Sequence, residues 1–218
     1  MSAFDRLLAG VVPAGSVAAW QAATFPDEAV PGLPTRSRAS AVLALFTTDD
    51  DPELLFTERA ATLRSHAGQV SFPGGRIDPG DASPQAAALR EASEEVSLDP
   101  RSVEVIGHLP ATTLTRAFRA TVVVGAWPGE AALVPEPAEV SQILRYPVSR
   151  LASDDARRSA RHPRGGMGPA FVLGDIVIWG FTAHLVDQLL TLGGWARHWD
   201  RSAVVEVPER FLRSSVPK

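Results

Sequence analysis

The chain has 218 residues, 45% of them hydrophobic and 21% charged, which is ordinary for a globular protein with a buried core. It contains no cysteine, which excludes disulfides and cysteine-ligated zinc. The net charge of −4 gives no broad basic field for nucleic acid, and no stretch approaches the roughly 20 apolar residues of a membrane span. The first six residues include an acid and do not read as a secretion signal. We therefore expect a cytoplasmic protein that binds neither nucleic acid nor membranes.

Residues 1–38 read as an extension. Residues 4–8 and 17–24 are candidates for short helices, and prolines then interrupt the chain up to position 38. We place a domain boundary there, so that residues 39–218 form one domain. The sequence leaves open whether the extension packs on its own domain or on a partner subunit.

The first half of this domain alternates strands with one helix. Residues 39–46 form a nearly continuous apolar run, typical of a buried strand, and residues 54–59 follow an acidic turn as its hairpin partner. Residues 83–98 predict a helix, with Ser83 as N-cap and Pro84 in the first turn. Further strands are expected at 103–109 and 120–126.

The second half is predicted with less regular elements. We expect a short strand at 142–146, a helical turn at 147–151, and an exposed hairpin or flexible loop at 153–169. Residues 170–173 and 175–179 suggest a hairpin, and a helix follows that ends at Gly193-Gly194. Mixed strands with two principal helices predict an α+β fold or three-layer sandwich.

The predicted helix at 83–98 carries the most informative residues of the chain. Glu91, Glu94 and Glu95 fall at helical positions i, i+3 and i+4, which places all three carboxylates on one face. Such a face is either solvated or holds a cation, and divalent ions such as Mg²⁺ prefer oxygen ligands. The preceding turn contains Gly74-Gly75, which lets the backbone approach a ligand closely.

The order of glycine loop, spaced acid and Arg90-Glu91-x-x-Glu94-Glu95 resembles the Nudix box. Three details depart from the family pattern. Gly75 lies one residue further from Arg90 than usual, Asp81 stands where glutamate is commoner, and Ser97 replaces the glycine that usually follows the two glutamates.

A second motif directly precedes the box. The run from Leu54 to Gly75, with Arg59, Arg64-Ser65-His66 and Gly68-Gln69 inside it, resembles the signature of the coenzyme A pyrophosphatase branch of the Nudix hydrolases. The resemblance implies a Nudix-like α/β/α sandwich with a mixed β-sheet between helices, and identifies residues 39–218 as the Nudix hydrolase domain.

The spacing and the resemblance together suggest a metal site for Mg²⁺ or Mn²⁺. Glu91 and Glu95 are one turn apart and are the expected main ligands, with Glu94 as a third. The resemblance adds the carbonyl of Gly75. We expect Arg90 to pair with an acid and fix the loop, since its planar guanidinium suits that role.

The general base stays open between Glu95, acting with the metal, and an acid from the loop that contains Glu136 and Glu139. The predicted catalytic residues are therefore Glu95, Glu94 and Arg90, and Glu139 is the preferred candidate from outside the helix.

Substrate contacts are predicted for Arg59, Arg64 and His66. For Arg59 the alternative is an ordinary exposed strand residue, and for His66 a loop-fixing histidine. A basic run later in the chain could hold an anion or simply be solvated; its members are Arg157, Arg158, Arg161, His162 and Arg164. Trp179 and Phe181 read as core residues rather than a platform for adenine.

The resemblance implies hydrolysis of coenzyme A or acyl-coenzyme A to 4′-phosphopantetheine and adenosine 3′,5′-bisphosphate. The alternatives are another nucleoside diphosphate derivative such as ADP-ribose, or a non-catalytic nucleotide-sensing module. The presence of all three glutamates favours an enzyme. A homodimer is a further expectation from the family.

Overall fold

The structure, a computed structural model, describes residues 7, 9, 11–13, 39–109, 120–162 and 165–212. The predicted helix at 17–24, the prolines that follow it and Arg164 lie outside the described residues. Of the predicted helix at 4–8, only Leu7 is described, and it is fully buried. Val11, just after that helix, is also buried. Both pack into the core of the main sheet, while the predicted boundary at residue 38 stays a prediction.

The strands, in chain order, are β1 (Val12–Pro13), β2 (Ser40–Thr47), β3 (Glu53–Arg59), β4 (Val70–Ser71), β5 (Gly74–Arg76), β6 (Glu104–His108), β7 (Ala120–Trp127), β8 (Val140–Pro147), β9 (Arg157–Arg161), β10 (Met167–Leu173), β11 (Ile176–Ile178) and β12 (Val204–Glu206). The helices are α3 (Pro84–Val96), α4 (Val148–Leu151), α5 (Gly180–Leu192) and α6 (Glu209–Leu212), with a 3₁₀ turn η1 (Pro100–Ser102). None of these helices has the length and hydropathy needed to cross a bilayer.

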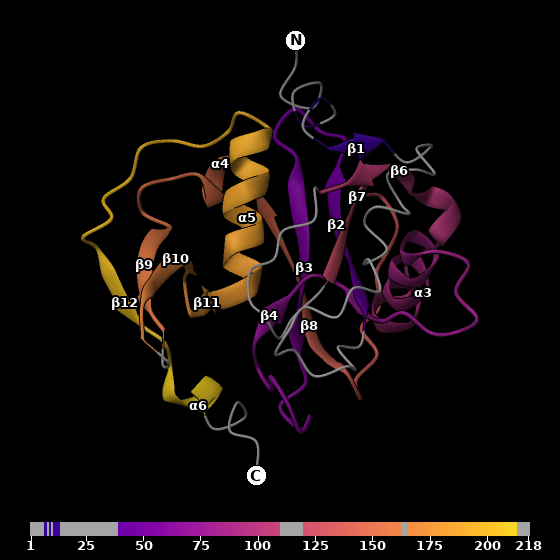
Figure 1. The fold of residues 1–218 in the computed structure, drawn as a ribbon, viewed down its shortest axis with the longest axis horizontal. Coiled ribbons are helices and arrows are strands. Elements are labelled where there is room, and N and C mark those ends of the chain that lie inside the picture. Colours follow the sequence, from indigo (N-terminus) through magenta and orange to yellow (C-terminus); the bar gives the residue numbers. More distant parts are fainter. Residues whose placement is uncertain are drawn as a thin grey trace, which may run out of the picture.

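The described strands form a main sheet and a smaller one. The main sheet runs β1-β6-β7-β2-β3-β4, with β5 on β2 and β8 on β3. It is mixed, because β2 pairs parallel with β7 and antiparallel with β3 and β5. Figure 1 shows α3 on one face of this sheet and α5 on the other, with the smaller sheet β11-β10-β9-β12 beyond α5. The predicted α+β sandwich with a mixed sheet between helices is confirmed.

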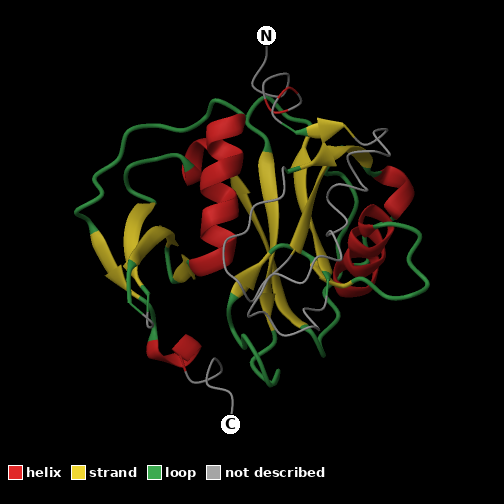
Figure 2. Cartoon of the chain, in the orientation of Figure 1, coloured by secondary structure: helices red, strands yellow, loops and turns green. Residues whose placement is uncertain are grey.

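Side chains of β2 alternate between two cores, as the period of a strand requires. Ala44 and Phe46 pack toward α5, whereas Leu43 and Leu45 pack toward α3. The side of α3 that faces the sheet consists of small residues, Ala87, Ala88, Ala92 and Val96. Small side chains let the helix lie close to the sheet, where it packs beside β2 and β5 (Figure 2).

The predicted caps of the acidic helix are present. The Ser83 side chain accepts a hydrogen bond from the amide of Ala86, and Pro84 begins the helix. Ser97 ends it in the left-handed region, with φ 56° and ψ 30°. This is the conformation for which glycine is favoured, and Ser97 adopts it at the position where the family pattern usually has glycine.

The region 153–169 is a hairpin, not a flexible loop, because β9 pairs with β10 from Arg157 to Met167. It is also less exposed than predicted. The Arg157 side chain is 4% exposed, bonds to Asp187, and lies between the rings of Phe171 and Trp199. Arg157 therefore does not belong to a solvated basic patch, unlike Arg161, which is exposed.

Candidate active site

Glu95 is the buried centre of the acidic face. Its side chain is 3% exposed, and Oε2 accepts a hydrogen bond from the amide of Gly74 at 3.0 Å. On its other side, Nη1 of Arg59 lies 4.0 Å from Oε1. A carboxylate with so little access to water is not a solvated surface acid. The alternative that the acidic helix face is simply solvated therefore does not hold for Glu95.

Gly75 makes room for Glu91. A Cβ built on Gly75 would lie 2.5 Å from the Glu91 carboxyl carbon, which is far inside van der Waals contact. Gly74 is equally constrained, with φ 150° and a virtual Cβ only 2.4 Å from the carbonyl oxygen of Ala41. The two glycines thus let β5 run between β2 and the carboxylates of α3. The sequence predicted a turn at Gly74-Gly75, and the structure has a strand there, paired with β2.

The electrostatics of the pair Glu91 and Glu95 are unfavourable. Burial, with a smaller effect from the charges of Glu91 and Glu139, raises the pKa of Glu95 to about 7, against the opposing effects of the Gly74 amide and Arg59. Burial also raises the pKa of Glu91, with Glu94 and Glu139 adding to the effect and Arg90 opposing it. The protein therefore gathers more negative charge here than its own cations balance.

Arg90 holds the loop before α3 against the helix. Its Nε is 3.0 Å from Asp81, its Nη1 is 3.0 Å from Glu94, and its Nη2 donates to Glu91 at 3.0 Å. It also donates to the carbonyl of Arg76 at 3.1 Å. These contacts agree with the predicted loop-fixing function, and the Arg90 hydrogen bond is the main reason that the pKa of Asp81 is lowered.

The loop between β7 and β8 closes another side of the site. The amide of Glu136 donates to the carbonyl of Glu95 at 2.9 Å, and the amide of Ala60 donates to the carbonyl of Glu139 at 2.8 Å. These backbone bonds bring Glu139 close enough to act on the pKa values of both buried glutamates. Glu139 is exposed, so it combines proximity with access to water.

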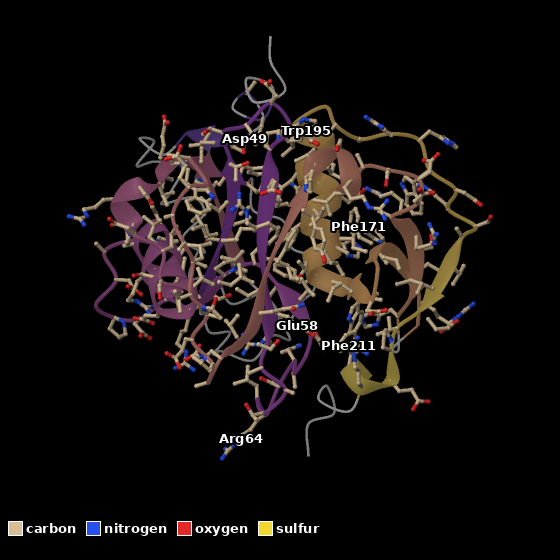
Figure 3. All side chains as sticks on the ribbon, turned by 180° about the vertical axis from the view of Figure 1, so that it is seen from behind. Asp49, Glu58, Arg64, Phe171, Trp195 and Phe211 are labelled. Atoms are coloured by element: carbon tan, nitrogen blue, oxygen red, sulfur yellow. The ribbon has the colours of Figure 1, made fainter. Side chains whose placement is uncertain are left out.

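The three predicted substrate residues separate into two groups. Arg59 lies at the site, where its Nη1 faces Glu95 and its buried Nε has no hydrogen-bond partner among the described residues. A β-bulge between Glu58 and Arg59 shifts the register of β3 at this point. Arg64 and His66 instead lie exposed in the loop after β3, with Arg64 at the lower end of the molecule in Figure 3.

The predicted metal ligands are brought together only in part. Glu91 lies against Gly75 and Glu95 bonds to the amide of the adjacent Gly74, whereas Glu94 is 59% exposed and bonded to Arg90. Within the described residues, no group of three or more acidic or histidine side chains is arranged as a complete metal site. The donor set of two carboxylates with excess negative charge nevertheless fits a hard divalent cation, which takes further ligands from water or substrate phosphates.

Sequence reasoning missed the amide of Gly74 as a partner of Glu95, and it could not place Arg59. A β-bulge leaves no clear pattern in the sequence. The direction of the Arg59 side chain depends on how β3 pairs with β8. Trp179 and Phe181 lie partly buried against apolar clusters, which agrees with their prediction as core residues. The described part of the basic run, including His162 beside Trp179, belongs to the smaller sheet.

The comparisons with known proteins agree with this geometry. The model of the NUDIX domain matches residues 37–164, more than half of the chain. The Nudix hydrolase NudL of Photorhabdus laumondii is 40% identical over 164 residues, covering 72% of this chain and 86% of the relative. NudL of Cronobacter sakazakii is 40% identical over 158 residues, covering 70% and 81%.

Solved structures support the fold. A Nudix hydrolase from M. smegmatis, RenU, superposes with a TM-score of 0.50 at 16% identity, covering 76% of this chain and 91% of that one. The matched domain, the two glutamates beside Gly74 and Gly75, and the arginine that holds Glu91 agree with one another. The chain therefore belongs to the Nudix family, and it is a hydrolase of the pyrophosphatase type.

Proposed function

We propose that this enzyme hydrolyses the diphosphate bond of coenzyme A or an acyl-coenzyme A, giving 4′-phosphopantetheine and adenosine 3′,5′-bisphosphate. The observation that carries the proposal is the continuity of two motifs. The segment that resembles the coenzyme A branch runs from β3 through the loop at 60–69 into Gly74-Gly75, and it ends against the buried Glu95.

In this proposal Glu91 and Glu95 hold Mg²⁺ or Mn²⁺, with the Gly75 carbonyl as an added ligand and Glu94 acting through water. A bound divalent ion neutralises phosphate oxygens and lowers the pKa of water. The excess negative charge around Glu95 supports this assignment, because a cation would relieve it.

The chain's own residues divide the remaining work. Arg90 keeps Glu91 and the loop in place through its bonds to Asp81 and Arg76. Arg59 presents positive charge beside Glu95, where the diphosphate would lie. Water adds to one phosphorus, the bond to the bridging oxygen breaks, and the leaving phosphate takes that oxygen. Glu139 is our candidate for accepting the proton of that water, with Glu95 as the alternative.

The loop residues Arg64 and His66 are proposed to meet the nucleotide part of the substrate, since both are exposed on the segment next to the site. A homodimer and a cytoplasmic location stay predictions.

The test is direct. Purified protein with Mg²⁺ or Mn²⁺ should convert coenzyme A into the two named products, identified by mass, and chelation should stop the reaction. Good turnover of ADP-ribose without turnover of coenzyme A would change the substrate and keep the reaction class. Ligand binding without hydrolysis under any divalent metal would instead favour a nucleotide sensor.

A further inference from the structure

The loop at 60–69 is a closed projection beside the site. At its base the amide of Arg59 donates to the carbonyl of Gln69 at 3.0 Å, and the amide of Gly68 donates to the carbonyl of Arg59 at 3.0 Å. Since the side chain of Arg59 also faces Glu95, the base of the loop and the acidic site share one residue. The conformation of the loop therefore fixes where Arg64 and His66 stand relative to the carboxylates.

Gln69 ties this loop to the far end of the chain. Its Oε1 accepts a hydrogen bond from Nδ1 of His66 at 3.1 Å, and its Nε2 donates to the carbonyl of Phe211 at 3.3 Å. His66 has a φ of 56°, a conformation that non-glycine residues rarely adopt. One amide side chain thus spans from an exposed loop residue to helix α6.

Phe211, to which the Gln69 side chain bonds, is itself held in the core. It is 2% exposed and belongs to an apolar cluster with Ala160, Ala170 and Val177 of the smaller sheet. Its ring stacks on Trp179 with centroids 6.4 Å apart.

The backbone of Gly68 also lies close to the Phe211 ring. A Cβ built on Gly68 would lie 3.4 Å from that ring, which is the limit of ordinary contact. A second hydrogen bond fixes the residue after Gln69: the buried Thr182 hydroxyl of α5 donates to the carbonyl of Val70 at 2.9 Å. Figure 3 shows Arg64 and Phe211 at the same end of the molecule.

We propose that Gln69 and Phe211 are positioning residues for substrate recognition: the C-terminal helix α6 holds the loop at 60–69 in its binding conformation through the Gln69 side chain. The smaller sheet then has a function in the reaction, because it carries the anchor for α6. The inference rests on the proposed function in one respect, namely that this loop meets the nucleotide part of the diphosphate substrate.

Two substitutions separate the contacts of Gln69. Gln69→Glu keeps an acceptor for His66 and removes the donor to Phe211, whereas Gln69→Met keeps the length of the side chain and removes both contacts. Gln142→Met, at an exposed position of β8, is the matched control. We expect Gln69→Glu, which loses one net hydrogen bond, to raise KM for coenzyme A about tenfold, and Gln69→Met, which loses both, to raise it at least as much, with kcat changed by less than about twofold in each.

Hydrogen exchange gives a second readout that does not need catalysis. The amides of Leu63, Gly68 and Gln69 are all bonded within the loop. They should exchange about tenfold faster in Gln69→Met than in the wild type, while strands β2 and β7 keep their protection.

Unchanged exchange in the loop would overturn the proposal, and so would faster exchange without a rise in KM, which would make the bridge purely structural. A fall in kcat at constant KM would also contradict it. If the wild type fails to hydrolyse coenzyme A, the proposed substrate is wrong. KM is then measured with the nucleotide diphosphate that the enzyme does cleave, and the exchange experiment still decides whether the bridge holds the loop.

Discussion

Two buried charges in this molecule have opposite surroundings. Arg157 in the smaller sheet is 4% exposed, and it is balanced by Asp187 and by the faces of Phe171 and Trp199, 4.7 and 4.6 Å from its guanidinium carbon. Glu95 in α3 is 3% exposed, but it lies among other carboxylates.

The difference separates a structural charge from a functional one. A buried ion with a carboxylate and two aromatic faces is compensated within the protein, so its removal costs stability. A buried carboxylate with several acidic neighbours and one arginine 4.0 Å away is only partly compensated, and it fits a site where an external cation completes the balance. Substitution of Glu95 should therefore change mainly activity, and substitution of Arg157 should change mainly the free energy of unfolding.

The largest expected effect is on activity at Glu95. Glu95→Gln removes the charge and keeps the shape, so kcat should fall about a thousandfold if Glu95 holds the metal. In chelator the variant should be at least as stable as the wild type, because the buried charge is gone. Activity and thermal unfolding of the same preparation check both statements, and a variant that is unstable but fully active would reverse our comparison.

The next effect is the pH dependence of stability without metal. The pKa of Glu95 is raised from 4.5 to about 7 in the folded state, so the folded protein binds more protons than the unfolded chain between these values. The free energy of unfolding should therefore decrease as pH rises from 4.5 to 7, by about 3 kcal/mol in total from this residue.

Denaturant titrations in chelator across this pH range provide the measurement. Glu95→Gln should flatten the slope, and Mn²⁺ should restore stability at pH 7. Equal slopes in the wild type and in Glu95→Gln would mean that Glu95 is compensated, like Arg157.

The contact between Gly75 and Glu91 allows a paired test. Gly75→Ala places a Cβ 2.5 Å from the Glu91 carboxyl and should displace it, lowering kcat/KM about a hundredfold. Gly80→Ala is the control, because nothing lies within 4 Å of its Cβ position. Equal activity of the two variants would remove Glu91 from the proposed metal site.

The smallest effect concerns Arg157. Arg157→Met should lower the free energy of unfolding by about 2 kcal/mol, through the loss of Asp187 and two aromatic contacts, and leave kcat and KM unchanged. Arg161→Met removes only an exposed pair with Glu206 and should cost less than about 0.5 kcal/mol. A loss of activity in folded Arg157→Met would show that this buried charge is functional after all.

Local sequence signals predicted much of the fold and the face of the site. The strand at 39–46 and the capped helix after Ser83 have short-range patterns, and Glu91 with Glu95 follows from helical spacing. The sequence could not show that Glu94 turns to Arg90, because that choice depends on the competing acids Asp81 and Glu91.

Non-local contacts account for most of the remainder. Arg157 reads as one of several basic residues in a run, and its burial follows only from Asp187 and Trp199, which lie far along the chain. β12 was not predicted, since its three residues pair in parallel with β9 and parallel pairing leaves no local turn signal. The hydrogen bond from Gln69 to Phe211 spans 142 positions, and no local pattern in the sequence predicts it.

The most direct test is a crystal structure of the enzyme soaked in Mn²⁺, with data collected at the manganese absorption edge. We predict an anomalous peak bonded to the carboxylates of both Glu91 and Glu95, and no peak at that place in Glu95→Gln. A wild-type site without manganese, or with these two side chains turned into solvent, would contradict the account.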